Sequence, residues 1–121
     1  MQLQQTLANN CNLITGYDTD HIYINRERYS GSLIVTPKHI EPWAVASFEA
    51  LCAEHFARLL TFTPEIVVLG TGRVQRFPHP ALSTILTQAS IGLESMDTQA
   101  ACRCFNILVS EDRRVVAALL P

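Results

Sequence analysis

The sequence predicts a single α/β domain, in which helices pack on a mixed β-sheet and an N-terminal β-hairpin adds antiparallel strands. The chain has 121 residues, enough for one domain that buries roughly two-thirds of its surface on folding. Its hydrophobic content of 48%, against 17% charged residues, supplies the core of such a domain. After Pro64, extended and helical patterns alternate, which is typical of parallel strands joined by right-handed crossovers.

Composition also excludes several classes of protein. Nine basic and eleven acidic residues give a net charge of −2, which argues against a nucleic-acid-binding protein that neutralises phosphates. No apolar run approaches the roughly 18 residues that span a bilayer, and residues 1–12 lack the basic region of a signal peptide. We therefore expect a soluble, cytoplasmic protein, with a weakly ordered leader over residues 1–12 and one domain over residues 13–121.

The first part of this domain consists of short extended patterns. Asn25 and Arg26 form a tight turn, so the segments on either side of it pair as a hairpin. The glycine at position 31 predicts a bulge or bend inside the second hairpin strand. Residues 37–43, which contain prolines at positions 37 and 42, are expected to form a loop. The predicted extended segments are residues 13–17, 21–24 and 28–35.

The segment after Trp43 fits helices of two different lengths. Apolar residues between Phe48 and Leu60 follow helical spacing, and Ser47 is a suitable cap for a long helix. A shorter helix over about residues 53–60 fits the same pattern equally well. Pro64 ends the helix in both interpretations.

A buried strand and an amphipathic helix come next. Residues 66–69 form an apolar, partly β-branched run between Pro64 and Gly70, which predicts a central strand. Pro80 suits the first turn of a helix. One face of that helix carries apolar residues at helical spacing, namely Leu82, Ile85, Leu86 and Ala89.

The C-terminal part predicts a strand, a helix and a final strand. The strand covers about residues 92–96, and Asp97 or Thr98 then caps the helix. An apolar strand over residues 114–120 follows. Residues 107–120 also fit a hairpin, because Ile-Leu-Val at 107–109 favours extended backbone.

A candidate ligand-binding crevice lies where two of the predicted parallel strands end. In open α/β sheets, ligands bind beyond the carboxyl ends of the strands, and two loops are expected there. The glycines let the backbone approach a ligand closely, while the helix N-terminus and the arginines favour an anion. The candidate crevice residues are Gly70, Thr71, Gly72, Arg73, Arg76, Asp97, Thr98, Arg103 and Asn106.

The same residues also have purely structural explanations. The Gly-x-Gly pair lacks the third glycine of a dinucleotide-binding motif and the lysine of a phosphate-binding loop, so a tight turn accounts for it. Capping alone accounts for Asp97 and Thr98. No serine stands in a nucleophile elbow, and no histidines have metal-ligand spacing. We predict no catalytic residue, no metal site and no cofactor, and we interpret the four cysteines as small hydrophobic residues.

Aromatic residues suggest a different kind of site. Tyrosine and tryptophan are favoured at interfaces, because each combines apolar area with a polar group. The alternative is that these side chains fill the outer hydrophobic layer. The candidate interaction surface consists of Tyr17, Tyr23, Tyr29 and Trp43.

Several short motifs resemble the Mth938-like domain family, a former domain of unknown function. The most specific are Leu-Gly-Thr-Gly at residues 69–72 and Met-Asp-Thr at residues 96–98, which leads to Asn106. Supporting motifs are Ile-Thr-Gly-Tyr at 14–17, Tyr-Ser-Gly-Ser-Leu at 29–33, Trp43, Ala-Cys-Arg at 101–103 and Val-Ala-Ala-Leu at 116–119.

The resemblance implies a three-layer α/β domain with a short second helix and a third helical segment that continues to about Ser110. Members of this family include single-domain bacterial and archaeal proteins, an adipogenesis-associated protein and a mitochondrial assembly factor for respiratory complex I. The family has no established catalytic activity or cofactor. Transfer of the assembly role to this chain rests on analogy of fold.

Two functions follow from these observations. The first is a non-enzymatic protein-interaction or assembly module, which binds a protein partner or a second copy through its aromatic surface. The alternative is a domain that binds a small anionic molecule, or an enzyme, that uses the crevice at the carboxyl ends of the parallel strands.

Overall fold

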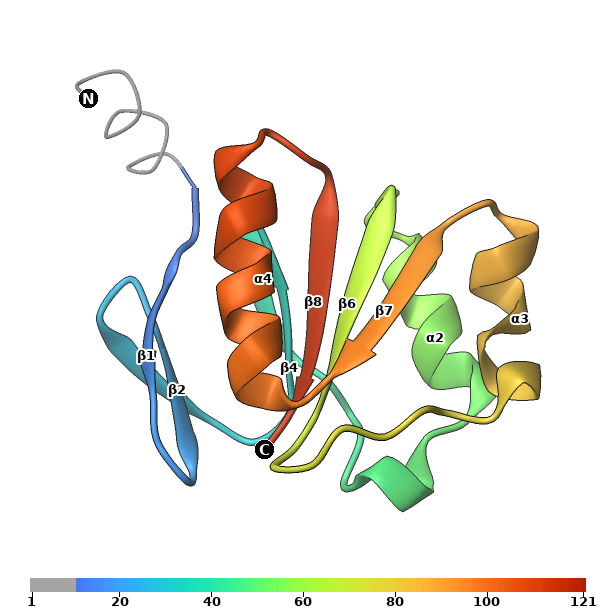
Figure 1. Ribbon diagram of the computed structural model, residues 1–121, viewed down its shortest axis with the longest axis horizontal. Helices are drawn as coiled ribbons and strands as arrows, with labels where there is room; N and C mark the ends of the chain where they lie inside the picture. The colour runs from blue at the N-terminus through green and yellow to red at the C-terminus, as the bar shows by residue number, and fades with distance from the viewer. Residues whose placement is uncertain (1–10) are drawn as a thin grey trace.

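The computed structural model describes residues 11–121, which form two β-sheets and three α-helices (Figure 1). The predicted three-layer α/β architecture is confirmed. The smaller sheet is antiparallel with the order β1-β2-β3, and the larger is mixed with the order β5-β4-β8-β6-β7. The strands are β1 (Ile14–Tyr17), β2 (His21–Ile24), β3 (Glu27–Ser30), β4 (Leu33–Thr36), β5 (His39–Pro42), β6 (Ile66–Thr71), β7 (Gly92–Met96) and β8 (Val115–Leu120).

Parallel pairing occupies the half of the larger sheet that ends at the edge strand β7. Strand β6 lies between β8 and β7 and is parallel to both, whereas β4 is antiparallel to β8 and β5. Helix α4 (Thr98–Ser110) covers one face, and α2 (Ala53–Leu60) and α3 (Pro80–Gln88) cover the other (Figure 1). Because both faces are covered, apolar residues occupy every position of β8.

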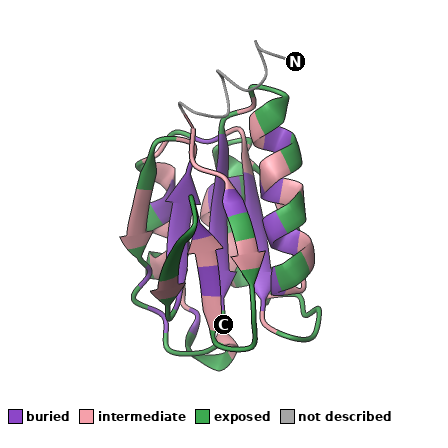
Figure 2. Cartoon of the chain, turned by 90° about the vertical axis from the view of Figure 1, so that its left-hand side faces the viewer, coloured by how far each residue is buried: buried purple, intermediate pink, exposed green. Residues whose placement is uncertain are grey.

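The period of two along the strands divides the core into two parts. Phe105 of α4 packs in one part with Ile14, Ile22 and Ile24 of the smaller sheet, and Phe56 of α2 packs in the other. Figure 2 shows buried residues along the central strands and exposed residues on the turns around them. In β8, the first part takes Val115, Ala117 and Leu119, and the second takes Val116, Ala118 and Leu120.

The predicted hairpin exists, but it does not belong to the mixed sheet. Asn25 and Arg26 have φ angles of 53° and 71°, the left-handed values that suit a tight two-residue hairpin turn. The predicted single strand over residues 28–35 is wrong, because Gly31 adopts a φ of 78° and divides it. Its first half, β3, stays with β1 and β2, while its second half, β4, enters the larger sheet.

The predicted loop over residues 37–43 is also wrong, since it contains strand β5. Thr36 pairs with His39 and Leu33 pairs with Pro42, so β4 and β5 form a second hairpin. Pro42 is tolerated because β5 is an edge strand and one side of its backbone needs no donor. The antiparallel strands of the mixed sheet are therefore β4 and β5.

The helices resolve the open alternatives. The shorter helix α2 is correct, and a single 3₁₀ turn, η1 (Phe48–Ala50), precedes it. Pro80 begins α3, and the Asp97 carboxylate accepts a hydrogen bond from the Ala100 N–H at the start of α4. Since α4 continues to Ser110, residues 107–120 do not form a hairpin. No helix within residues 11–121 is long and apolar enough to cross a membrane.

The predicted leader falls almost entirely on residues 1–10, outside the described residues. Asn12, which the same prediction included, is bound to the domain. Its backbone N–H donates to the Pro37 carbonyl at 2.8 Å, and its Nδ2 donates to the Thr36 carbonyl at 2.9 Å. Asn12 Oδ1 accepts from Asn25 Nδ2 at 2.8 Å, so this residue joins the turns of both hairpins.

Candidate functional site

The loops that follow β6 and β7 meet at one edge of the sheet, as expected for parallel neighbours. A single hydroxyl joins them to the end of β8. Thr98 Oγ1 accepts from the Gly72 N–H at 2.8 Å and donates to the Leu120 carbonyl at 2.6 Å. The Thr98 N–H donates in turn to the Gly72 carbonyl at 2.8 Å. Thr98 is only 9% exposed, so this residue is buried, and its hydrogen bonds link the ends of β6, β7 and β8.

Both glycines of the Gly-Thr-Gly sequence are required by close contacts. A Cβ atom on Gly70 would lie 3.0 Å from the Cα of Thr98, because α4 begins directly against β6. Gly72 has a φ of 90°, and a Cβ there would lie 3.0 Å from the Pro121 carbonyl oxygen. These glycines therefore pack the strand ends, helix and C-terminal residue closely together.

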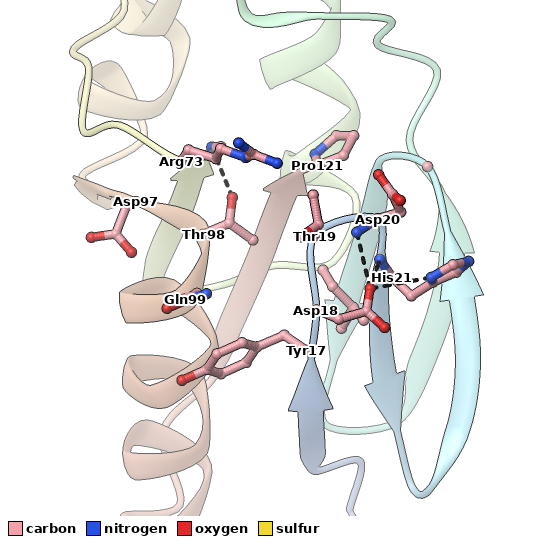
Figure 3. A pocket seen from close by; sticks show the side chains of 13 residues that line it. Tyr17, Asp18, Thr19, Asp20, His21, Arg73, Asp97, Thr98, Gln99 and Pro121 are labelled. Atoms are coloured by element: carbon pink, nitrogen blue, oxygen red, sulfur yellow. Dashed lines mark hydrogen bonds and ion pairs between the residues drawn. The ribbon is translucent and has the colours of Figure 1, made fainter.

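A hollow of about 380 Å³ lies beside this junction (Figure 3), and we call it the acidic hollow. The turn between β1 and β2 forms one wall, and the start of α4 with the loop after β6 forms the other. Its lining residues are Tyr17, Asp18, Thr19, Asp20, His21, Ile22, Gly31, Gly72, Arg73, Asp97, Thr98, Gln99 and Pro121.

The structure places four predicted crevice residues in the acidic hollow: Gly72, Arg73, Asp97 and Thr98. Arg103 and Asn106 instead hold strand β1 against α4. The Asn106 amide accepts from the Ile14 N–H at 2.9 Å and donates to the Ile14 carbonyl at 2.8 Å. Arg103 Nη1 donates to the Tyr17 hydroxyl at 3.0 Å. These two side chains thus position the wall that Tyr17 contributes.

Arg76 and Thr71 fix the loop after β6, which covers residues 72–79. Thr71 Oγ1 donates to the Val74 carbonyl at 2.7 Å and accepts from the Arg76 N–H at 3.1 Å. The Arg76 guanidinium lies 4.7 Å from the centre of the Phe48 ring, and its Nη1 is 2.6 Å from Glu49 Oε2. The hydrogen bond from Arg76 holds the pKa of the Glu49 carboxyl below its usual range.

This anchored loop exposes apolar side chains that no sequence motif singled out. Val74 is 65% exposed and Phe77 is 73% exposed. Gln75, between them, donates from Nε2 to the Ser95 carbonyl at 3.0 Å, which ties the loop to β7. The signal was present in the sequence as apolar residues within a polar loop, but the pattern does not show which of them the fold buries.

Carboxylates dominate the acidic hollow. Asp18 accepts hydrogen bonds from the N–H groups of Asp20 and His21 and from the Tyr23 hydroxyl. These hydrogen bonds, with the Asp20 N–H first among them, lower the pKa of Asp18, so it remains charged at neutral pH. The Asp97 carboxylate already caps the positive end of α4. Three of the lining residues are aspartates, and Arg73 is the only arginine or lysine of the lining.

A second hollow of about 420 Å³, which we call the Phe48 hollow, adjoins the first. The two share five lining residues: Thr19, Asp20, Gly72, Arg73 and Pro121. Its remaining lining residues are Ala46, Ser47, Phe48, Glu49, Thr71, Val74, Arg76 and Leu120.

The predicted aromatic surface is not continuous. Trp43 is only 4% exposed, and its indole N–H donates to the His55 carbonyl at 3.2 Å, so it belongs to the core rather than to a contact surface. Tyr29 is half-buried and packs against the core of the smaller sheet. Tyr23 is half-buried with its hydroxyl on Asp18, and Tyr17 is the exposed member of the set.

Within residues 11–121, no group of three or more His, Cys, Asp or Glu residues is arranged to hold a metal ion. The described cysteines are all free thiols. Burial raises the pKa of Cys102 to about 12, so this thiol is neutral and unreactive at physiological pH.

Known proteins resemble the chain over almost its whole length. Residues 14–120 match the family described as "Protein of unknown function (DUF498/DUF598)". The NADH dehydrogenase (ubiquinone) 1 alpha subcomplex assembly factor 3 of Xenopus tropicalis is 37% identical over 111 residues, which cover 89% of this chain and 60% of that protein. The chain thus spans about three fifths of the length of that relative.

Solved structures agree with this assignment. A crystal structure of a Bordetella parapertussis protein has a TM-score of 0.89 and 36% identity, and the match covers 94% of this chain and 98% of that one. A Bordetella pertussis protein described as a Mth938-like domain has a TM-score of 0.84 and 30% identity, with coverage of 94% and 88%. The resemblance predicted from the sequence motifs is confirmed.

Proposed function

This chain belongs to the DUF498/DUF598 family of proteins of unknown function, and we propose that it is a non-enzymatic protein-interaction module that assists the assembly of a larger complex. Relatives named as assembly factors of NADH dehydrogenase support this role. The free cysteines support a reducing, cytoplasmic location.

The observation that carries the proposal is the exposure of Val74 and Phe77 on an anchored loop. Apolar side chains on a mobile loop would lose conformational entropy when a partner binds. In this chain Thr71, Gln75 and Arg76 already fix the loop, so a partner gains apolar contact at little entropic cost. Contiguous exposed apolar patches with a polar rim mark protein-binding surfaces, and Val74 and Phe77 are three residues apart on one loop.

The hydrogen bonds at the junction also support a non-enzymatic role. The Thr71 hydroxyl donates to the backbone of the loop after β6, the Thr98 hydroxyl donates to the end of β8, and the Asp97 carboxylate accepts from a backbone N–H of α4. Groups engaged in this way hold the fold together and are poorly placed to exchange protons with a substrate.

Affinity capture with matched variants tests the proposal. The wild-type chain should recover a defined protein partner from its source cells, and the double variant Val74→Ser, Phe77→Ser should lose that partner. Ile107→Ser is the control, because Ile107 is 57% exposed on α4, outside the anchored loop, and should leave capture unchanged. All three exposed positions should alter stability by less than about 0.5 kcal/mol.

Two results would contradict the proposal. One is recovery of the same partner by the wild type and the double variant. The other is the absence of any partner, including a second copy of the chain, in capture and in sedimentation over a range of concentrations.

A further inference from the structure

We propose that the acidic hollow and the Phe48 hollow form one groove for an extended segment of a partner protein. The segment inserts a lysine or arginine side chain into the acidic hollow and an apolar side chain into the Phe48 hollow. This inference rests on the proposed function and specifies the chemistry of the partner.

The two hollows share part of their walls. Thr19 and Asp20 of the β1–β2 turn line both, and so do Gly72, Arg73 and Pro121 on the opposite side. In Figure 3 the Arg73 side chain extends from the loop after β6 towards Pro121, and these two residues line both hollows. A ligand that fills one hollow can therefore continue into the other without leaving the surface.

The acidic hollow suits a cationic side chain through charge. Among the described residues, the Asp20 carboxylate has no hydrogen bond or ion pair, so its charge is available to a ligand. Asp18 and Asp97 add two further negative charges to the lining. A lysine or arginine placed beside the β1–β2 turn gains attraction mainly from Asp20, because the Asp18 carboxylate is already engaged by His21 and Tyr23.

An aromatic side chain adds a second attraction for a cation. Tyr17 lines the hollow and is 36% exposed. The hydrogen bond from Arg103 to its hydroxyl holds the ring in place at the hydroxyl end. A cation near the face of a tyrosine ring is stabilised by the ring quadrupole. Aromatic and acidic groups in one concave site therefore favour a cation over an anion or a neutral polar group.

The Phe48 hollow suits an apolar side chain. Phe48, Val74 and Leu120 contribute apolar surface to it. The charged groups beside them are already paired, because Arg76 binds Glu49 and lies over the Phe48 ring. A second charged side chain would find no unpaired partner in this hollow except the shared residues Asp20 and Arg73.

The shape of the groove favours an extended segment. Side chains of an extended peptide that are two residues apart point in the same direction, and adjoining hollows can accept them together. The exposed Val74 of the anchored loop lines the same groove, so this binding mode is continuous with the surface proposed for partner binding.

Arg73 distinguishes a positively charged ligand from a negatively charged one. Its guanidinium has no hydrogen bond or ion pair within the described residues, and the residue lines both hollows. For a basic segment, Arg73 is a repulsive neighbour, and its replacement by a carboxylate should tighten binding. For an anionic ligand, Arg73 is the main attraction, and the same change should abolish binding.

The experiment measures binding of fluorescent synthetic octapeptides to the full chain. The peptides have a threonine background, which favours extended backbone, with Lys, Arg, Glu or Ser at one position and Leu or Ser two residues before or after it. The wild type should bind the peptides that combine Lys or Arg with Leu most tightly. Replacing the basic residue by Glu, or Leu by Ser, should weaken binding by roughly three- to tenfold.

Charge variants of the chain complete the test. Asp20→Lys should weaken binding of the basic peptides by roughly three- to tenfold, and Arg73→Glu should tighten it by about threefold. Glu54→Lys is the control for added positive charge, because Glu54 is exposed on α2 and does not line the groove, and it should leave the affinity unchanged. Unchanged melting temperatures should show that these exposed substitutions preserve the fold.

Three results would overturn the inference. The first is no peptide binding at concentrations up to about 1 mM. The second is preference for the acidic peptides with loss of binding in Arg73→Glu, and the third is equal affinity in all charge variants. The second result identifies an anion site instead. If any of these occurs while partner capture still depends on Val74 and Phe77, the groove inference is wrong and the proposed function stands. If capture also fails, the proposed function is wrong as well.

Discussion

Gly70 determines how closely helix α4 can approach the central sheet. A Cβ atom at this position would lie 3.0 Å from Thr98 Cα, Thr98 Oγ1 and Leu119 Cδ2. Two of these atoms belong to Thr98, whose hydroxyl holds the strand ends together, so neither can move freely. Because glycine has only a hydrogen atom at this position, the start of α4, which forms part of the wall of the acidic hollow, can lie directly against β6.

Gly70→Ala should destabilise the protein by about 1–3 kcal/mol, because the added methyl group overpacks a rigid contact. Equilibrium urea denaturation measures the change. Gly92→Ala is the control, since its Cβ would lie 3.8 Å from the nearest atom, Ile66 Cγ1, an ordinary contact. Equal effects of the two substitutions would contradict the close packing at Gly70.

Thr98 allows a second test at the same junction. Thr98→Val keeps the shape of the side chain but leaves the Gly72 N–H and the Leu120 carbonyl without this partner. We expect a loss of about 1–3 kcal/mol in the free energy of unfolding, whereas Thr98→Ser, which keeps the hydroxyl, should lose less. A valine variant as stable as the serine variant would show that the hydroxyl contributes little.

Trp43 shows a limit of sequence reasoning about single residues. An indole ring combines apolar area with one N–H donor, and both interfaces and cores satisfy these requirements. The partner of the donor is the carbonyl of His55, which becomes a neighbour only when α2 folds against the sheet. The residue type therefore could not distinguish a buried tryptophan from an exposed one.

Strand β5 and helix α2 are connected by a cluster of charged groups. Glu41 accepts from Arg58 Nη2 at 2.7 Å and Nε at 2.9 Å, and it lies 2.8 Å from His39 Nε2. The hydrogen bonds from Arg58 and then from His39 lower the pKa of Glu41 from its ordinary value of 4.5. Protonation of Glu41 would therefore weaken the attachment of the edge strand to the helix.

The pH dependence of stability follows from the direction of this shift. Because the pKa of Glu41 is lower in the folded state, its contribution is complete above about pH 4.5 and is lost as the pH falls through the folded pKa. Glu41→Gln should therefore be less stable than the wild type near neutral pH, and the difference should shrink below about pH 4.5. Urea midpoints between about pH 3 and 7 measure this difference. A difference that does not change with pH would show that the charge of Glu41 is not its source.

Elements with a clear local pattern were predictable, but the edge strand β5 was not. The apolar run of β6 and the Pro80 start of α3 were sufficient to identify those elements. Strand β5 is short and bounded by prolines, which usually indicate a loop, and only pairing with β4 makes it a strand. Gly31 indicated a bend, but its consequence, transfer of the chain from one sheet to another, depends on packing far away in sequence.

On the scale of the whole molecule, the candidate site combines segments that are distant in the chain. The sequence predicted the wall formed by Arg73, Asp97 and Thr98, because both loops follow adjacent parallel strands. The opposite wall comes from the β1–β2 turn, and Asn106 and Arg103 attach the strand before this turn to α4, at separations of 92 and 86 residues. No local pattern could place this turn, so the acidic character of the site was not predictable.

The net charge of −2 conceals an uneven distribution of charge. The acidic hollow lies where the parallel strands end. A third hollow lies before β6 and at the start of β8, and its charged lining residues are Lys38, Asp112, Arg113 and Arg114. A basic segment of a partner is thus directed to the end that also carries the anchored apolar loop.

Hydrogen exchange of the free chain and of its captured complex tests the central claim most directly. If the anchored loop and the groove bind the partner, the amides of residues 18–22 and 72–77 should exchange more slowly in the complex. Exchange near Ile107 at the other end of α4 should remain unchanged. Protection that appears around Ile107 or along β3, with none in residues 18–22 and 72–77, would contradict partner binding at the loop and groove.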